Sequence, residues 1–221
     1  MMVEEKIQAE ENLRQQFLVI CRDIETQLHQ GGEAPVFVAI DGQCASGKTT
    51  LGRMLAGRFD CNLFHMDDFF LRPEQRTAER LAEVGGNVDY ERFRHEVLEP
   101  VLQREAFTYR TFNCKTQQFA KAVAVPVKRL NIVEGSYSRH PYFGGYYQLG
   151  YCLLIAAEEQ EKRIRKRNGA DMLKRFTEEW IPKENAYLEM LGLKTAAERK
   201  HAVVAGEQNE GGNDSCRQSA Y

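Results

Sequence analysis

The stretch VFVAIDGQCASGKTT, residues 36–50, carries the strongest structural signal in the chain. It opens with five apolar residues, Val36 to Ile40, which is typical of a central parallel strand covered by helices on both faces. A glycine-containing loop follows, and helical sequence then runs from about Thr49 to Arg58. The order of strand, loop and helix indicates an α/β protein.

The loop between that strand and that helix, Gly42 to Thr49, matches the pattern G-x4-G-K-[ST] at every fixed position. Its glycines let the backbone turn so that successive N–H groups converge on phosphate oxygens, and the helix N-terminus adds partial positive charge. We expect this phosphate-binding loop (P-loop) to hold ATP, with Lys48 at the β- and γ-phosphates and the Thr49 hydroxyl at Mg²⁺. The residues expected to contact the nucleotide are Gly42, Ala45, Ser46, Gly47, Lys48, Thr49 and Thr50.

The rest of the chain alternates strand and helix signals, which favours a doubly wound sheet. Strands are expected at 62–66, 130–133, 151–156 and 202–205, and helices at 89–103, 158–167 and 176–191, the last kinked or split by Pro182. We therefore predict an α/β, three-layer P-loop NTPase fold with a central parallel sheet and a helical lid.

Composition divides the chain into three parts. Apolar residues at helical spacing predict an N-terminal helix within residues 1–32, packed on the core. Residues 33–205 are expected to form the P-loop domain, with its lid near 158–170. Residues 206–221 are polar and contain glycine, so a disordered tail is expected.

The overall composition restricts the class of protein. The chain has 221 residues, 43% of them hydrophobic, and a net charge of −2, which argues against a dedicated binder of nucleic acid or of anionic membranes. Its apolar runs are far shorter than the ~20 residues of a membrane span. Six cysteines without a CxxC pair, and an N-terminus without a signal sequence, lead us to expect a cytoplasmic protein.

Two further strand ends indicate what kind of P-loop protein this is. The sequence lacks the guanine-reading N-K-x-D motif, and Glu134-Gly135 stands where motor ATPases have Asp-Glu. Glu134 can hold Mg²⁺ through water. Asp67 and Asp68 follow the strand at 62–66, where a kinase needs an acceptor for the proton of the attacking hydroxyl. Asp67 is the candidate base, and Asp68 is the alternative.

Basic and histidine side chains supply the remaining candidates. Arg163 and Arg167 lie four residues apart, so they share one helix face. In a kinase lid such arginines neutralise charge on the transferred phosphoryl group, although a solvated basic face is the other interpretation. His65 has no partner at metal-ligand spacing, so we expect a structural role or a place in the wall of a substrate pocket.

Taken together, these motifs resemble those of the uridine kinase and phosphoribulokinase group of P-loop kinases. The resemblance rests on GQCASGKTT, on MDDFF at 66–70, on NVDYERF at 87–93, on Tyr109, on IVEG at 132–135 and on KRIRKRNG at 162–169, in the order of the family. It implies phosphoryl transfer from ATP to a hydroxyl, typically the 5′-hydroxyl of a nucleoside. It also implies that Asp67 is catalytic, as are Lys48, Arg163 and Arg167, and that Asp68, Asp89 and Tyr109 bind the substrate.

The motifs are compatible with more than one compound as the acceptor of the phosphoryl group. Phe112-Asn113-Cys114 stands where nucleoside-reading members carry a histidine, and Asp67 to Phe70 followed by Arg72-Pro73 is similar to nicotinamide riboside kinases. A nucleoside is therefore the expected acceptor, with nicotinamide riboside or another small metabolite as the alternative. A nucleotide-dependent switch or assembly factor is the alternative of another class. The expected partner is a small hydroxyl compound, with neither nucleic acid nor membrane, and a homo-oligomer is left open.

Overall fold

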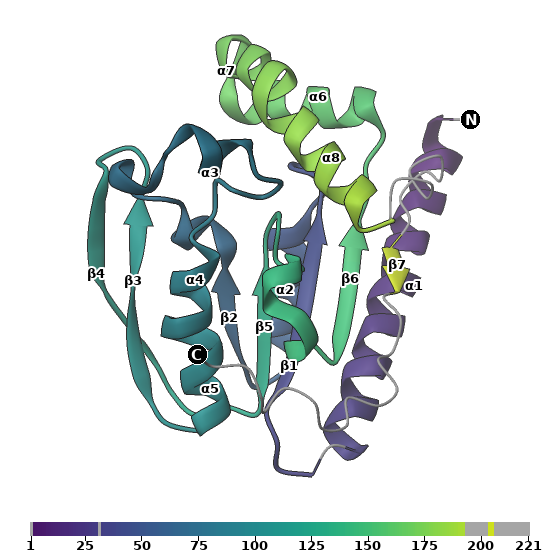
Figure 1. The fold of residues 1–221 in the computed structure, drawn as a ribbon. Coiled ribbons are helices and arrows are strands. Elements are labelled where there is room, and N and C mark those ends of the chain that lie inside the picture. The colour runs from purple at the N-terminus through teal and green to yellow at the C-terminus, as the bar shows by residue number, and fades with distance from the viewer. Residues whose placement is uncertain (1, 31, 193–202, 206–221) are drawn as a thin grey trace.

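The computed structural model describes residues 2–30, 32–192 and 203–205. A sheet of order β2-β5-β1-β6-β7 lies at its centre (Figure 1). Its strands are β1 Val36–Gly42, β2 Cys61–His65, β5 Leu130–Glu134, β6 Leu149–Leu153 and β7 Val203–Ala205. The first four pair in parallel, and β7 pairs antiparallel with β6. The prediction of an α/β fold with a central parallel sheet is confirmed.

Helices cover both faces of this sheet. On one face α1, Met2–Gln30, and α2, Lys48–Arg58, pack against alternate residues of β1 such as Val38 and Ile40. On the other face lie α4 Tyr90–Phe93, the π-helical η3 Arg94–Leu98, α5 Glu99–Gln103 and α8 Ile181–Met190. Each face buries its own apolar cluster, so the molecule has the three layers that the sequence predicts.

A two-stranded hairpin stands beside β2 (Figure 1), and the sequence analysis did not predict it. Its strands are β3, Phe107–Asn113, and β4, Gln118–Val125. The turn lacks an Asn-Gly or Asp-Gly pair; instead the Asn113 side chain accepts hydrogen bonds from the N–H groups of Lys115 and Thr116. The hairpin was missed because its turn is made by side-chain chemistry rather than by glycine or proline.

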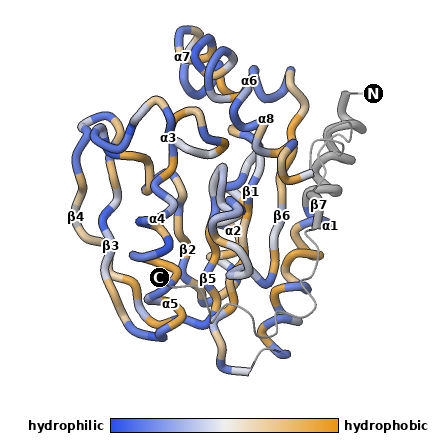
Figure 2. Tube along the Cα trace, viewed as in Figure 1, coloured by the Kyte–Doolittle hydropathy of each residue, from blue (hydrophilic) through white to orange (hydrophobic). Residues whose placement is uncertain are grey.

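Above the carboxyl ends of the parallel strands lie α6, Ala157–Asn168, and α7, Ala170–Arg175 (Figure 1). Most residues of α6 are hydrophilic (Figure 2), but Ile164 is fully buried. It packs with Leu173 and Phe176 against Cys44 and Ala45 of the P-loop. These helices are therefore attached to the loop by a small apolar cluster of their own.

The boundaries of several elements differ from the expected ones. The strand expected at 151–156 begins two residues earlier, at Leu149, and ends at Leu153. The expected helix 176–191 is split: a π-helical turn, η5 Phe176–Trp180, precedes α8, which has Pro182 in its first turn, where its missing N–H is tolerated. The expected tail, residues 206–221, lies outside the described residues, as does Ala202 of the expected last strand.

The remaining elements are short. They are η1 Met66–Phe69, η2 Pro73–Gln75, α3 Ala78–Ala82 and η4 Pro141–Tyr146. Within the described residues, no helix combines the length and the apolar character that crossing a membrane requires.

Candidate active site

The P-loop lies at the carboxyl end of β1 and requires unusual backbone geometry. Gly42 has φ 132°, and a Cβ added there would lie 2.0 Å from the carbonyl oxygen of Leu153. Gly47, which caps α2, has φ 104°, and Ala45 has φ 60°, a strained value for a residue with a side chain. The loop thus makes the sharp backbone turns that the glycine positions of the motif predict.

The P-loop and the first turn of α2 offer hydrogen-bond donors, which fits the binding of a phosphate chain. The first turn of α2 leaves N–H groups without helical partners. The Nζ of Lys48 donates to the carbonyl oxygens of Gly42, at 2.9 Å, and Gln43, at 2.8 Å, and so lies along the inside of the loop. Ser46 Oγ is buried and has no hydrogen-bond partner within the described part of the chain. Thr49 and Thr50 follow on the exposed first turn of α2. This arrangement fits the binding of a triphosphate.

Thr49 and Glu134, the two expected metal-binding residues, are in contact. Thr49 Oγ1 donates to Glu134 Oε1 at 3.0 Å and Oε2 at 3.1 Å. Glu134 ends β5, opposite Ile40 of β1, so sheet register places its carboxylate beside the loop. In the described ranges no cluster of three acidic, histidine or cysteine side chains could hold a metal by itself. A hydroxyl, a carboxylate and substrate phosphates match the way Mg²⁺ is commonly bound.

His65 belongs to this site, which sequence reasoning did not recognise. Its Nδ1 lies 2.5 Å from Glu134 Oε1, because β2 pairs with β5 in a register that places His65 opposite Glu134. This hydrogen bond raises the pKa of His65. The available signal was that both residues end adjacent strands, but the strand order could not be read from the sequence.

Asp67 lies on η1, directly after β2. Its side chain reaches solvent, yet protein surrounds most of it, and this burial raises the pKa of its carboxyl above the ordinary value. The charge of Lys48 acts in the opposite direction, as does that of Arg167 in the lid. The P-loop lysine and Arg167 of α6 thus both favour the ionised form of the candidate base.

Asp68 and Tyr109 meet on the side of the hairpin. The hydroxyl of Tyr109 donates to Asp68 Oδ2 at 3.4 Å, and its ring stacks on Phe69 with centroids 5.3 Å apart. Burial raises the pKa of both Asp68 and Tyr109. The fold thus joins two of the three residues expected to bind the substrate.

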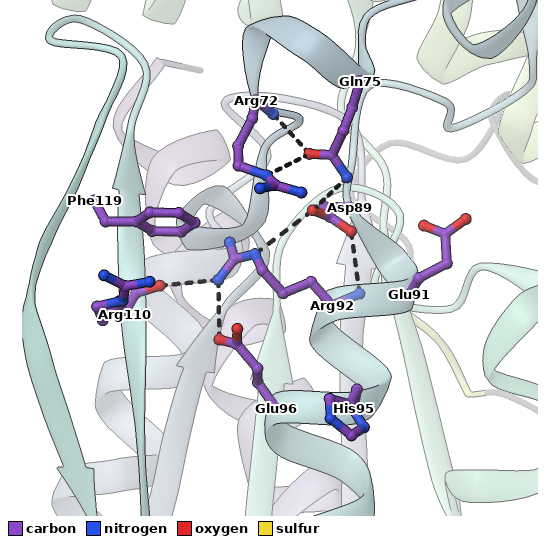
Figure 3. A pocket seen from close by; sticks show the side chains of 9 residues that line it. All are labelled: Arg72, Gln75, Asp89, Glu91, Arg92, His95, Glu96, Arg110 and Phe119. Carbon is purple, nitrogen blue, oxygen red and sulfur yellow. Dashed lines mark hydrogen bonds and ion pairs between the residues drawn. The ribbon is translucent and has the colours of Figure 1, made fainter.

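Asp89, the third of them, caps the N-terminus of α4 and is buried. Its carboxylate accepts hydrogen bonds from the N–H of Arg92, at 3.1 Å, and from Gln75 Nε2, at 2.9 Å. It also lines a pocket of about 440 Å³ between α4 and the hairpin (Figure 3), a volume typical of small-molecule sites. The other residues lining this pocket are Arg72, Gln75, Glu91, Arg92, His95, Glu96, Arg110 and Phe119.

The two expected lid arginines do different things. Arg163 binds Glu159 Oε1 at 2.8 Å and the carbonyl oxygen of Ala45 at 3.2 Å, so it ties α6 to the P-loop. Arg167 is exposed, and its charge lowers the pKa of Asp67 against the larger effect of burial. The Arg167 Nε donates to the Asn168 side chain at 2.7 Å, and its guanidinium lies 5.9 Å from the centroid of the Phe176 ring.

The contacts of α8 with the P-loop were not predicted. Glu184 Oε2 accepts a hydrogen bond from the N–H of Cys44 at 2.8 Å, and its Oε1 accepts one from Ser136 Oγ, also at 2.8 Å. Gln43 Nε2 donates to the Asn185 side chain at 3.2 Å. A buried carboxylate thus fixes the first half of the loop from a helix about 140 residues away.

Comparisons with known proteins bear on this arrangement. A family model for shikimate kinase matches residues 44–109. No match was found among curated proteins. A structure called a "possible uridine kinase", from Bacillus stearothermophilus, has a TM-score of 0.61 and 19% identity, over 86% of this chain and 97% of that one.

Two further solved structures are similar. A "putative fructose transport system kinase" from Silicibacter sp. TM1040 has a TM-score of 0.63 and 20% identity, over 79% of this chain and 94% of that one. The "YGR205w protein" has a TM-score of 0.59 and 12% identity, over 86% and 96%. At these identities the likeness concerns the fold. The predicted resemblance to the uridine kinase group is confirmed in that sense: the fold is that of P-loop small-molecule kinases.

Proposed function

We propose that this protein is an ATP- and Mg²⁺-dependent kinase that transfers the γ-phosphoryl group to a hydroxyl of a small molecule. The observation that supports this most is the place of Asp67. The charges of Lys48 and Glu134 act on its carboxyl, and the backbone carbonyl of its neighbour Asp68 accepts a hydrogen bond from Arg92, which lines the 440 Å³ pocket. A nucleotide switch would need the P-loop but not the pocket.

Each residue has a role that follows from its position. Lys48 and the loop N–H groups bind the phosphates, and Thr49 with Glu134 holds the metal, which when bound neutralises phosphate charge. Asp67 accepts the proton that the attacking hydroxyl loses. Arg167 neutralises charge on the transferred group, and Arg163 holds the lid on the loop.

The acceptor that the motif resemblance favours is the 5′-hydroxyl of a nucleoside, and nicotinamide riboside is the alternative. Tyr109 and Phe69 lie near Asp68, but both are buried and stack on each other, so they present no exposed ring face to a planar base. Phe112 is also buried and packs on Phe119 with centroids 5.6 Å apart, so this position offers no polar group to read a base.

ADP release measured with Mg²⁺ and ATP, with and without added acceptors, tests the proposal. The panel contains nucleosides, nicotinamide riboside, and sugars and hydroxy acids with and without phosphate. The proposal expects at least one compound to raise the rate above the acceptor-free rate. A slow rate that no compound changes would contradict it and would favour a nucleotide-dependent switch.

A further inference from the structure

The charged residues that line the pocket between α4 and the hairpin are not all paired with one another. Its acidic residues are Asp89, Glu91 and Glu96, and its arginines are Arg72, Arg92 and Arg110. Figure 3 shows the three guanidinium groups gathered around one space. The formal charges of these six side chains balance, so the question is which of the arginines has a carboxylate partner.

Two arginines account for all three carboxylates. Arg92 lies 3.6 Å from Asp89 and 3.2 Å from Glu96, and it is almost entirely buried. Glu91 is paired from outside the pocket by Arg80, at 2.6 Å. The guanidinium groups of Arg72 and Arg110 therefore face the pocket without a carboxylate from its lining.

Of these two arginines, Arg110 has fewer polar contacts with the protein. Its guanidinium lies 4.4 Å from the centroid of the Phe119 ring, and among the described residues it makes no hydrogen bond or ion pair. Arg72 donates to the Gln75 side chain and pairs with Glu74 in an exposed contact of 3.2 Å, the kind of ion pair that contributes little. Burial lowers the pKa of Arg92, Glu96 and Asp89 oppose this shift, and the charge of Arg72 has a smaller lowering effect.

We propose that this pocket binds an anionic group of the acceptor, a carboxylate or a phosphate, between Arg72 and Arg110. The planar guanidinium matches both anions through paired N–H donors. This inference rests on the proposed kinase activity and specifies its substrate class. It disfavours nicotinamide riboside, which is cationic, and a neutral nucleoside would leave both guanidinium groups unused.

The pocket is also fixed relative to the candidate base. Arg92 donates to the carbonyl oxygen of Asp68 at 2.8 Å, and the N–H of Asp89 donates to that of Phe69 at 2.7 Å. Both acceptors belong to η1, which carries Asp67. An acceptor held by its anion in this pocket is thus held relative to the residue that must take its proton.

Matched sets of acceptors test the inference. One set is glycerol, glycerate and glycerol 3-phosphate; a second is ribose, ribonate and ribose 5-phosphate; uridine is the neutral nucleoside. We expect an anionic member to give kcat/KM at least ~10-fold above its neutral counterpart, since hydrogen bonds to charged groups carry such factors. The anion that the pocket binds is identified by which acceptors, the carboxylates or the phosphates, show the higher kcat/KM.

The variant Arg110→Gln removes the charge from an exposed side chain without breaking an internal hydrogen bond. We expect it to raise KM for the anionic acceptor ~10-fold or more while kcat changes little. Arg58→Gln, which makes the same change in an exposed pair with Glu25 on the α1 side, is the control and should leave KM unchanged. An unchanged KM in Arg110→Gln would overturn the inference.

Two outcomes separate this inference from the kinase proposal. If only uridine or another neutral compound stimulates ADP release, the anion pocket is wrong and the kinase stands. If no compound stimulates release, the kinase proposal fails, and thermal unfolding decides on the pocket. A rise in Tm with an anionic compound that Arg110→Gln abolishes supports an anion site, and equal Tm values in both proteins overturn it.

Discussion

At the scale of single residues, the proposed phosphoryl transfer depends most on Asp67. Within the described residues its carboxylate forms no ion pair, and the charges with the largest effects on its pKa are those of Lys48, Glu134 and His65. The substitution Asp67→Asn keeps its size and removes its basicity. We expect kcat to fall by ~10²–10⁴, the usual contribution of a general base, while ATP binding by calorimetry stays near wild type. Retained turnover would remove Asp67 from this role and leave Asp68 as the alternative.

The pH dependence of turnover reports on the same carboxyl. Asp67 accepts a proton only when ionised, and burial raises its pKa. Turnover should therefore fall as the pH drops through this raised pKa, at a higher pH than the value of about 3.9 for an ordinary aspartate. The measurement is kcat at saturating substrates across the acid range. A rate that stays flat down to about pH 4 contradicts the assignment.

The sequence predicted these residues to different degrees. Lys48 and Thr49 follow from a motif, and Asp67 and Glu134 from their places at the ends of apolar strands. The contact of His65 with Glu134 depends on β2 and β5 being neighbours, and this strand order could not be predicted from the sequence. The role of Arg110 depends on how the hairpin folds beside α4, which is a long-range arrangement.

At the scale of elements, Arg163 and Arg167 lie on the same helix, α6, but make different contacts. Arg167 is exposed and its charge acts on Asp67, so we expect Arg167→Ala to lower kcat roughly 10²-fold or more, with little effect on ATP affinity. Arg175→Ala is the control: Arg175 also lies in the lid but pairs with Glu179 and packs 4.9 Å from the Trp180 ring. Equal rates in the two variants would assign Arg167 to a solvated face.

A second prediction at this scale concerns the hydrogen bond between α8 and the P-loop. Glu184 accepts a hydrogen bond from the N–H of Cys44, and Glu184→Gln replaces its charged acceptor with a neutral amide. We expect the Kd for ATP to rise by ~3–10-fold, because the loop loses a charge-assisted bond that holds its shape. Glu178→Gln, an exposed site on η5, controls for the change of charge. Matching affinities in the two variants would show that α8 does not organise the loop.

Among the elements, those with strong periodicity were predictable. The lid helix and the strands at 36–40 and 130–133 have clear helical or apolar patterns. The hairpin was not predicted because its turn uses the Asn113 side chain and a left-handed Gln117, φ 55°, instead of glycine. Because the hairpin forms one wall of the pocket, the pocket could not be predicted either.

At the scale of the whole molecule, one buried carboxylate joins the sheet to the last helices. Asp41, at the end of β1, accepts hydrogen bonds from the N–H groups of Gly42, Tyr137 and Arg139 and from the Tyr187 hydroxyl of α8, at 2.5 Å. Burial raises the pKa of Asp41, and these bonds oppose that rise. The fold therefore depends on Asp41 keeping its donors.

Tyr187→Phe removes one of these donors and changes little else. We expect the free energy of unfolding to fall by ~1.5–3 kcal/mol, the range for a hydrogen bond to a charged group, measured by urea denaturation. Tyr142→Phe makes the same change in a residue that is 40% exposed, and it should be close to neutral. A Tyr187→Phe variant as stable as Tyr142→Phe would contradict the view that α8 is fixed through Asp41.

The layered architecture could be predicted as a class, because alternating strands and helices with a continuous apolar first strand allow few alternatives. The order β2-β5-β1-β6-β7 and the contact of α8 with the P-loop could not, since both join segments distant in sequence. These are also the contacts that bring the candidate site together.

The fate of the γ-phosphoryl group distinguishes a kinase from a nucleotide-dependent switch. With γ-labelled ATP, Mg²⁺ and the acceptor panel, the label is followed into organic phosphate ester and into inorganic phosphate. The proposed kinase predicts that label appears in an ester only when an acceptor is present, and that Asp67→Asn suppresses it. Label found only in inorganic phosphate, at a rate that no acceptor changes, would contradict the account.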